Sequence, residues 1–429
     1  MITDPTTINQ CFLRLAGVNI LGVEDLLEGP LRVHVESVQA VQWCRLCGVA
    51  AHVKDRPRVE LIDLGVDGCP TRLVWQKRRF CCREVGCSMG SWTEADPRIA
   101  STRMQMTDRS GRWITEQVGR YARSVSEVAK ELGCDWHSVN EAVVAYGQAL
   151  LEDPHRFDVV EALGLDEVAF LGEAPYYRTQ FSTWIVDVGS AQLLDVVPGR
   201  SGKEPLAWLQ AQGYEWLSHV RYATLDLSGP YRAVFDAVLP NATQVADPFH
   251  VVKLANTKLD ECRRRIQNEL LGHRGRKNDP LYRARRLLTK AEERLSKNGR
   301  EKLFGLLRAG DPDGHVATTW QAKELIRSLY DHDNEALAFE FITRLGSDFK
   351  DAAPPEVRSL GRMLLKWKSQ IIAWHQAHVT NGPTEAMNNL IKRVKRAAFG
   401  FRSFRNYRVR ALLYAGKPNW SLLATITPR

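Results

Sequence analysis

Between residues 160 and 252 the sequence alternates short apolar segments with amphipathic ones in an order that constrains the fold. Three apolar segments of strand length come first, and the turn Gly189-Ser190 separates the second from the third. Two helical segments then alternate with two further strands. The segments in chain order are ALGLDEVAFLG, QFSTWIVDVGS, AQLLDVVPGRS, GKEPLAWLQAQG, VRYATLDLSGPY, PYRAVFDAVLP and TQVADPFH. This order is that of a ribonuclease-H-like core, in which helices pack on a mixed sheet.

Two aspartates stand on strands of this pattern. Asp166 lies within the first strand, and Asp226 lies at the end of the fourth. These two strands are neighbours in a ribonuclease-H-like sheet, so we expect the two carboxylates to lie close together. Neighbouring carboxylates repel each other, and a divalent metal ion with oxygen ligands relieves that repulsion. Taken singly, either residue would be read as an ordinary surface or turn carboxylate.

A third carboxylate, Glu385, heads a helical segment with the sequence NGPTEAMNNLIKRVKR, residues 381–396. Asn381 or Thr380 can cap this helix, and Pro383 suits its first turn. Glu385 would complete a site for two Mg2+ (or Mn2+) ions about 3.5–4 Å apart, as in other two-metal phosphoryl-transfer enzymes. The three- and four-residue spacing predicts a buried stripe of Met387, Leu390, Ile391, Val394 and Ala398. The residues expected to follow a phosphate backbone are Asn388, Asn389, Lys392, Lys395, Arg396 and, further on, Arg402.

The N-terminal region concentrates its cysteines, six of nine lying between residues 44 and 87. Cys44-x2-Cys47 and Cys82-x4-Cys87 have the spacing of two halves of a tetrahedral zinc site, and structural Zn2+ is favoured over buried free thiols. The segments RPRVELIDLG and TRLVWQKRRF between them alternate like two strands and would bring the pairs together as a zinc ribbon. Cys81 would point to the opposite side of its strand, and His52 is a possible substitute or supporting ligand. The metal would supply much of the folding energy of so small a region.

Residues 124–150 predict two helices joined by a turn at Gly133-Cys134, the pattern of a helix-turn-helix. Ser124 or Ser126 can cap the first helix, and Asp135 can cap the second. The shared core would consist of Val128, Leu132, Val139 and Val143. The second helix would present Trp136, His137, Asn140 and Glu141 to a DNA major groove. A preceding amphipathic helix, GRWITEQVGRYAR, is also expected.

Positive charge is unevenly distributed along the chain, whose formal net charge is +9. Residues 253–290 contain 12 Lys and Arg against 4 Asp and Glu, and residues 385–410 contain 8 against 1. Such clustering is the electrostatic footprint of a polyanion, most often nucleic acid. The alternative for any single run is a solvated helical face. Two separate runs, the second with aromatic residues interleaved in FGFRSFRNYRVR, favour nucleic acid. With the predicted helix-turn-helix, we expect double-stranded DNA as the partner.

The chain contains no apolar run approaching the ~18 residues of a membrane span, and its N-terminus does not resemble a signal peptide. We therefore expect a cytoplasmic protein, associated with the bacterial nucleoid if it binds DNA. The cysteines of a cytoplasmic chain are not expected to form disulfides.

Residues 253–378 read as a helical insertion within the α/β core, and helices such as RRRIQNELL and RARRLL could hold DNA, hold a second protomer, or be solvated. The predicted architecture is thus multidomain α+β. Its segments are an N-terminal part, 1–100, with a zinc ribbon at about 40–95; a helix-turn-helix, 101–155; the first part of a ribonuclease-H-like core, 156–252; the insertion, 253–378; and the last core helix with a basic C-terminal part, 379–429.

Four segments closely resemble the catalytic core of insertion-sequence transposases of the ISL3 family. They are LGLDEVAF, VVPGRS, ATLDLSGPYRAVFDAVLPNATQVADPFHVVKLAN and NGPTEAMNNLIKRVKRAAFGFRSFRNYRVR. The cysteine region and the helix-turn-helix also fall where that family has them. The resemblance implies a DDE transposase with Asp166, Asp226 and Glu385 as its catalytic triad, and supporting roles for Asp247 and His250.

The implied activity is binding to the terminal inverted repeats of the element, followed by strand cleavage and transfer into target DNA with two metal ions. One ion would lower the pKa of the attacking water, and the other would stabilise the leaving 3′-oxygen. Joining two ends implies a homodimer or a larger assembly. The alternatives are a non-catalytic DNA-binding regulator and a nuclease without strand transfer; a glycosidase would leave the cationic surface unexplained.

Overall fold

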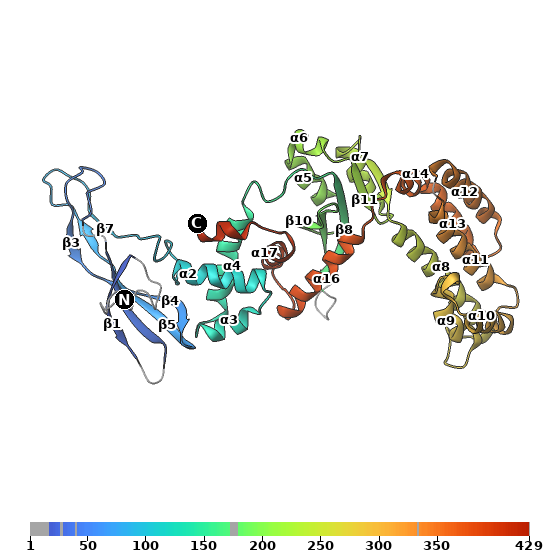
Figure 1. Ribbon diagram of the computed structural model, residues 1–429, viewed down its shortest axis with the longest axis horizontal. Coiled ribbons are helices and arrows are strands. Elements are labelled where there is room, and N and C mark those ends of the chain that lie inside the picture. Colours follow the sequence, from blue (N-terminus) through green and yellow to red (C-terminus); the bar gives the residue numbers. More distant parts are fainter. Residues whose placement is uncertain (1–16, 26–28, 39–40, 172–178, 333, 429) are drawn as a thin grey trace, which may run out of the picture. The chain divides into compact units, whose positions relative to one another are not determined.

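The computed structural model describes residues 17–25, 29–38, 41–171, 179–332 and 334–428 (Figure 1). The chain divides into two compact units, one formed by Met1–Asp158 with Asn389–Arg429 and the other by Val159–Asn388. Within the described ranges, no helix is both long and apolar enough to cross a membrane.

The first unit begins with a four-stranded sheet, in which β2 alternates buried and half-buried side chains. The sheet consists of β1 (Val18–Glu24), β2 (Leu31–Ser37), β5 (Cys69–Gln76) and β4 (Arg58–Val66), in that order. Strands β2 and β5 are parallel, whereas the other two pairings are antiparallel. Apolar side chains of this sheet, including Val33, Leu61 and Trp75, form a separate core.

The two strands predicted between the cysteine pairs are present as the antiparallel hairpin β4–β5. Its arms continue, after short breaks, as β3 (His52–Asp55) and β6 (Arg79–Cys81). These two strands join β7 (Ser91–Thr93) in a second, three-stranded sheet with the order β3-β6-β7. The sequence pattern did not reveal that the two arms run through two sheets, with β4 and β5 in the first and β3 and β6 in the second.

A helical layer completes the first unit around one apolar core. The helices are α2 (Asp108–Thr115), η1 (Glu116–Arg120), α3 (Val125–Glu131), α4 (Trp136–Leu151), α17 (Phe404–Ala415) and η5 (Trp420–Ala424). Val128, Leu132, Val139 and Val143 lie in this core, as expected for the shared core of two short helices. Gly147 allows α4 and α17 to approach closely, since a Cβ there would lie 2.9 Å from Leu413 Cδ1.

The caps of α3 and α4 follow from the sequence. Ser124 and Glu127 form a reciprocal capping box at the start of α3, so Ser124 rather than Ser126 is the N-cap. Asp135 accepts a hydrogen bond from the Ser138 N–H at the start of α4. The predicted helix of residues 111–123 begins earlier, at Asp108, and its last turn is a π-helix.

The second unit is built on a five-stranded mixed sheet. Its strands are β8 (Ala162–Leu171), β9 (Gln180–Asp187), β10 (Gln192–Pro198), β11 (Tyr222–Leu225) and β12 (Thr243–Ala246). The strand order is β10-β9-β8-β11-β12, so the first and fourth strands are neighbours, as predicted. Strands β8, β9 and β10 pair antiparallel, whereas β8, β11 and β12 pair parallel. The helices α5 (Lys203–Ala211), α6 (Gly213–Ser218) and α7 (Gly229–Val238) connect the strands.

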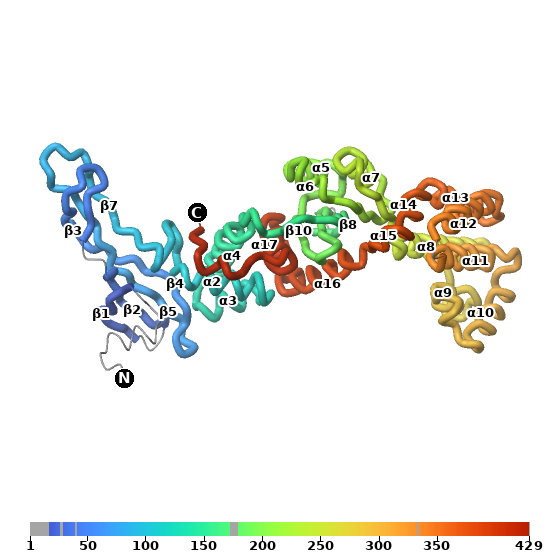
Figure 2. Tube along the Cα trace, turned by 45° about the horizontal axis from the view of Figure 1, so that its top comes forward, coloured from blue at the N-terminus to red at the C-terminus, as the bar shows by residue number. Residues whose placement is uncertain are grey.

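A helical region follows β12 and returns to it (Figure 2). Its α-helices are α8 (Pro248–Leu271), α9 (Pro280–Thr289), α10 (Lys297–Gly310), α11 (His315–Ser328), α12 (Glu335–Asp348), α13 (Pro355–Lys366), α14 (Lys368–Ile372) and α15 (Trp374–Ala377). Its short 3-10 helices are η2 (Glu292–Arg294), η3 (Leu329–Asp331) and η4 (Phe349–Asp351). Because α14 and α15 contact β12, the chain re-enters the sheet where it left it.

Helix α16 (Gly382–Ala397) begins where the predicted C-terminal helix was placed. The Asn381 carbonyl accepts the Glu385 N–H, and its side chain accepts the Thr384 hydroxyl at 2.9 Å. Met387, Ile391 and Val394 are buried, as predicted. Leu390 is 38% exposed, so its assignment to the buried stripe was wrong. Ala398, just past the end of the helix, is half-buried. Met387, Ile391 and Val394, at four- and three-residue steps, already fill the buried face.

Candidate active site and metal centre

Asp166 and Asp226 lie on adjacent parallel strands of the second unit. Asp166 is a residue of β8 and is 8% exposed, whereas Asp226 follows the last residue of β11. The backbone turns sharply after β11, where Leu227 adopts a left-handed conformation with φ 57°. Strained backbone of this kind is concentrated at functional sites. The parallel pairing of β8 with β11 thus brings together two carboxylates that are far apart in the sequence.

Glu385 and His250 complete the group of ionisable side chains. Glu385 lies in the first turn of α16, and His250 lies in the first turn of α8. The imidazole of His250 lies between two acids, with Nδ1 3.9 Å from Asp226 Oδ2 and Nε2 3.8 Å from Glu385 Oε1. His250, expected only in a support role, is therefore the side chain that contacts both.

Asp247 connects the two helices that carry His250 and Glu385. Its carboxylate accepts the Phe249 N–H at 3.0 Å, which caps α8, and the Asn381 N–H at 3.2 Å, next to the start of α16. The aspartate is almost fully buried. Asp247 thus holds the starts of both helices close to the end of β12.

The side chain of Asn381 forms a second connection, from α16 to the sheet. Its Oδ1 accepts the Thr224 hydroxyl of β11 at 3.0 Å. Gly164 of β8 leaves room for this contact, since a Cβ there would lie 3.0 Å from Asn381 Oδ1. From the sequence, Asn381 is a possible N-cap of α16, and no pattern in the sequence indicates its contact with β11.

Asn388 donates a hydrogen bond from Nδ2 to Asp166 Oδ2 at 2.8 Å. It had been expected among the residues that follow phosphates, but in the structure it holds a carboxylate. Its position three residues after Glu385 puts both side chains on the same side of the helix, which is the sequence signal for this role.

Burial and mutual repulsion shape the electrostatics of the site. Burial, followed by the charge of Asp226, raises the pKa of Asp166 above its usual range, and the Asn388 hydrogen bond opposes this shift. Burial likewise raises the pKa of Asp247. Asp226 Oδ1 is buried and has no hydrogen-bond partner among the described residues. An orphaned carboxylate oxygen beside a second buried carboxylate suits a hard divalent cation with oxygen ligands.

The three carboxylates are not drawn into a single tight group. Among the described residues, no set containing Asp166, Asp226 and Glu385 has ligand atoms all within 4.8 Å of one another. Like charges repel at short range, and the imidazole of His250 fills the space between two of them.

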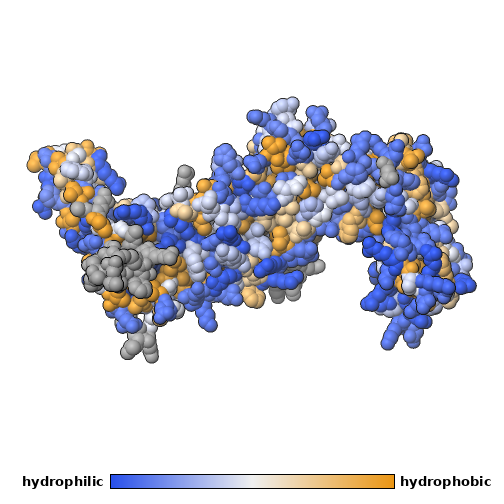
Figure 3. All heavy atoms as spheres, viewed as in Figure 1, coloured by the Kyte–Doolittle hydropathy of each residue, from blue (hydrophilic) through white to orange (hydrophobic). Residues whose placement is uncertain are grey.

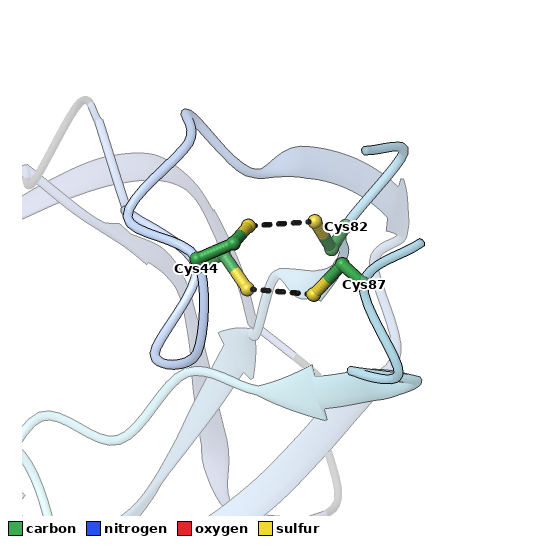
Figure 4. A group of neighbouring side chains, drawn as sticks. Cys44, Cys82 and Cys87 are labelled. Atoms are coloured by element: carbon green, nitrogen blue, oxygen red, sulfur yellow. Dashed lines mark hydrogen bonds between the residues drawn. The ribbon is translucent and has the colours of Figure 1, made fainter. Parts of the chain in front are cut away.

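The four predicted zinc ligands do form such a tight group (Figure 4). The sulfur atoms of Cys44, Cys47, Cys82 and Cys87 all lie within 4.8 Å of one another. Two of the distances are 3.7 Å, from Cys44 to Cys87, and 3.5 Å, from Cys47 to Cys82. Sulfurs bound at about 2.3 Å to a tetrahedral zinc are about 3.8 Å apart, so these four thiols fit the metal.

Local backbone geometry prepares the first cysteine pair for a metal. The Cys44 N–H donates to the Val49 carbonyl, and Gly48 takes a positive φ of 72° that closes the turn. Backbone N–H groups of Cys47 and Leu46 lower the pKa of the Cys44 thiol to about 6 and so favour the thiolate. Cys81 and His52 pair with each other across β3 and β6 and are not part of the sulfur group.

Apolar side chains around the cysteine loops remain exposed (Figure 3). They include Trp43, Leu46, Val49, Val53 and Val85. The small three-stranded sheet therefore buries little apolar surface of its own, which agrees with the expectation that a metal would stabilise it.

The residues predicted to contact DNA differ in accessibility. On α4, Trp136 and His137 are exposed, whereas Asn140 is half-buried and lines a groove with Arg405 and Asn406. The exposed residues of the C-terminal set are Asn389, Lys392, Arg396 and Arg402. Lys395 is half-buried, with its ammonium 5.2 Å from the ring centre of Tyr407, and burial lowers its pKa.

Comparison with known proteins relates the chain to one family. Residues 163–411 match a family model described as a transposase, the DDE type of the ISL3 group. The transposase for insertion sequence element IS1001 of Bordetella parapertussis is 23% identical over 385 residues, covering 87% of this chain and 88% of that protein. The transposase for IS1557 of Mycobacterium tuberculosis is 26% identical over 302 residues, 66% of each chain. The family match spans more than half of the chain and includes the strands and the helix that carry the three carboxylates. The chain therefore belongs to the ISL3 family of DDE transposases.

Proposed function

We propose that this transposase binds the terminal inverted repeats of its insertion sequence, cleaves the DNA strands there and transfers them into target DNA. The observation that carries the proposal is that Asp166 and Asp226 come from neighbouring parallel strands of the second unit, while His250 lies between Asp226 and Glu385. The strand order β10-β9-β8-β11-β12 supports a ribonuclease-H-like catalytic core, which we assign to residues 156–252 with the last helix from residues 379–429.

The three carboxylates would hold Mg2+ or Mn2+, and two such ions would activate the attacking water and stabilise the leaving 3′-oxygen. Asp226 offers a buried oxygen without a partner, and Asn388 orients Asp166 by hydrogen bonding one of its two oxygens. His250 lies within reach of Asp226 and Glu385 and would set the distance between them. Asp247 would keep His250 and Glu385 in place by connecting the starts of their helices.

Recognition of the element ends is assigned to the first unit. Its α3–α4 pair, with an exposed Trp136 and His137 at the start of α4, has the features of a helix-turn-helix within residues 101–155. The four-cysteine cluster would bind one structural Zn2+ as a ribbon at about residues 40–95. The exposed cations of residues 389–402 would contact phosphates rather than bases.

A second DNA-contacting surface is proposed on α9, in the helical insertion of residues 253–378. Arg283, Arg286 and Lys290 are exposed, and none has an ion pair with a carboxylate among the described residues. Arg283 and Arg286 share the face of α9 opposite the buried Leu281 and Leu288, and Lys290 is the C-cap residue that follows the helix. Like charges so placed repel one another, and a phosphate backbone would relieve that repulsion. Figure 3 shows the strongly hydrophilic surface of this region.

The test is strand cleavage by the purified full chain with Mg2+ and a duplex that carries the element's own ends. Asp226→Asn should lower cleavage at least about 10³-fold, because a metal ligand supplies several kcal/mol of transition-state stabilisation. Binding of the same duplex should be unchanged. Asp236→Asn, which replaces an exposed carboxylate on α7, is the matched control and should cleave normally.

The results separate this proposal from its alternatives. Absence of metal-dependent nicking by the unchanged chain, with normal end binding, would indicate a non-catalytic DNA-binding regulator. Nicking without joining to a target duplex would indicate a nuclease without strand transfer. Equal loss of binding and cleavage in Asp226→Asn would refute the role assigned to Asp226.

A further inference from the structure

Phe399, in the turn between α16 and α17, is unusual in both exposure and backbone conformation. Its side chain is 92% exposed, so almost none of its apolar surface is removed from water. Its φ is 52°, in the left-handed region that non-glycine residues rarely adopt. Both features are unfavourable in the isolated chain, and such a combination points to a role that requires the ring to be available.

The turn is held in this conformation by the end of α16. The N–H groups of Ala398, Phe399 and Gly400 donate to the carbonyls of Val394, Arg396 and Lys395, each at 3.0 Å. A residue at this position after a helix is commonly glycine, because a left-handed φ is then free of strain. The Phe399 ring is therefore directed outward by an ordered, hydrogen-bonded turn.

The neighbouring aromatic residues are packed, in contrast to Phe399. Phe401 is 9% exposed, and its ring centre is 5.4 Å from that of Tyr407. Arg410 covers the Phe401 ring at 5.3 Å. The sequence FGFRSFRNY thus places one aromatic ring outside, buries Phe401 and Tyr407, and leaves Phe404 half-buried.

The exposed side chains described next to this turn are mainly cationic. Residues 386–429 contain no Asp or Glu. Lys392 and Arg396, which share one face of α16, are exposed, and so are Gly400, Arg402 and Ser403. A protein partner for an exposed phenylalanine would need further apolar contacts, and none of these five described residues offers an apolar side chain. A polyanion that also offers flat aromatic rings satisfies both the cations and the phenyl group, and DNA is such a partner.

We propose that Phe399 stacks on a base of the bound DNA that has left its own stack, while the surrounding cations hold the adjacent phosphates. The inference rests on the proposed function, since it names a contact made when the element's end is bound. Side chains that insert between base steps unstack them and hold the duplex in a distorted form. Stacking on DNA would also bury the phenyl ring, which offsets its exposure in the free protein.

The test places 2-aminopurine, one position at a time, across the terminal repeat and its flank, and measures emission on binding of the full chain. At one position, or at two adjacent ones, the 2-aminopurine fluorescence should rise several-fold because the base is unstacked. Phe399→Ala should lose this rise and bind about 5- to 100-fold more weakly. Phe399→Tyr, which keeps a flat ring, should retain both signal and affinity.

Two further variants separate stacking from stability and from general exposure. Phe399→Gly removes the left-handed strain, so it should fold at least as stably as the unchanged chain and still lose the emission signal. Tyr214→Ala, which removes an 84% exposed ring from α6, should leave signal and affinity unchanged.

The results distinguish failure of this inference from failure of the proposed function. If the unchanged chain binds the end duplex but no position brightens, or if Phe399→Ala keeps the signal, the stacking role is wrong while end binding stands. If the unchanged chain does not bind the duplex, both proposals fail. If Phe399→Ala changes the oligomeric state of the DNA-free protein but not the 2-aminopurine emission, the ring belongs to a protein interface and the inference is overturned.

Discussion

The buried carboxylate of Asp166 opposes folding at neutral pH. Burial and the charge of Asp226 raise its pKa, so the unfolded chain ionises this group more readily than the folded one. The stabilising contribution of the neutral form is complete below the usual aspartate pKa of about 3.9. It is lost as the pH rises through the raised pKa of the folded state.

Replacing Asp166 with Asn should therefore stabilise the protein in EDTA at about pH 8, where the usual aspartate would be ionised. The unfolding temperature, measured by scanning fluorimetry, should exceed that of the unchanged chain, and the difference should shrink towards about pH 4. Mg2+ at about 100 times its Kd should stabilise the unchanged chain by about 2.7 kcal/mol and Asp166→Asn far less. Equal unfolding temperatures of Asp166→Asn and the unchanged chain in EDTA would show that burial of this carboxylate does not lower the stability of the fold.

At the residue scale, the sequence indicated which residues belong to the candidate site more readily than it indicated the contacts between them. The strand pattern indicated that Asp166 and Asp226 would be neighbours, and the helical pattern of residues 381–396 added Glu385. The resemblance to a family then implied that all three form a catalytic triad. No sequence signal indicated that His250 would lie between two of these acids, because that contact depends on how two helix starts meet at the end of β12. Asn388 was named for phosphates, yet it hydrogen bonds Asp166.

At the scale of elements, the four-cysteine cluster gives a sharp test because a fifth cysteine adjoins it. Cys82→Ser removes one sulfur of the group, whereas Cys81→Ser changes the neighbouring thiol, which is not part of it. Zinc bound per chain, measured by plasma mass spectrometry, should fall from one equivalent to near zero in the first variant and stay unchanged in the second.

Loss of zinc should also unfold the small sheet β3-β6-β7. Structural zinc sites in small peptides contribute about 10–16 kcal/mol of apparent binding free energy at neutral pH, more than so small an apolar core can supply. Limited proteolysis should therefore cut within residues 41–95 of Cys82→Ser and spare Cys81→Ser. Equal zinc content in both variants would contradict the assigned ligand set.

The α9 surface makes a prediction about salt dependence. Changing Arg283, Arg286 and Lys290 to Gln should reduce the slope of log affinity against log salt for duplex DNA by roughly 2 to 3, since each phosphate contact contributes about 0.9. Fluorescence anisotropy over a salt series measures this slope.

The matched control removes the same charge from the same region. Arg264, Arg300 and Arg344 are ion-paired with Asp260, Glu292 and Asp348, so each already has a carboxylate partner within the chain. Changing these three to Gln should leave the slope nearly unchanged. A similar decrease in both triple variants would indicate an effect of net charge alone.

The elements themselves were predictable wherever local signals agreed. Ser124 and Asp135 begin their helices as their cap chemistry requires, and the alternating strands of the second unit follow the expected order. Two details depended on tertiary contacts and were missed. The hairpin β4–β5 shares its sheet with β1 and β2, and Leu390 lies outside the buried face of α16.

At the scale of the whole molecule, the described structure has two units where the sequence reading drew five segments. The helical insertion belongs to the same unit as the mixed sheet because α8 begins directly after β12 and α14 returns to it. Residues 389–429 join the N-terminal unit, since Val409 and Leu413 share a core with α3 and α4. Contacts of this kind between distant segments are not encoded in local periodicity.

One chain carries one set of the three proposed catalytic carboxylates, whereas a transposition event must cut and join two ends. We therefore expect the active species on DNA to contain at least two protomers. Mixing the unchanged chain with Asp226→Asn before adding paired-end DNA tests this expectation. If each end is cut by one protomer, single-end cleavage should fall in proportion to the fraction of unchanged chain. Joining of both ends should fall with the square of that fraction, because both protomers must be competent. A linear decrease in joining would instead mean that a single protomer processes both ends in turn.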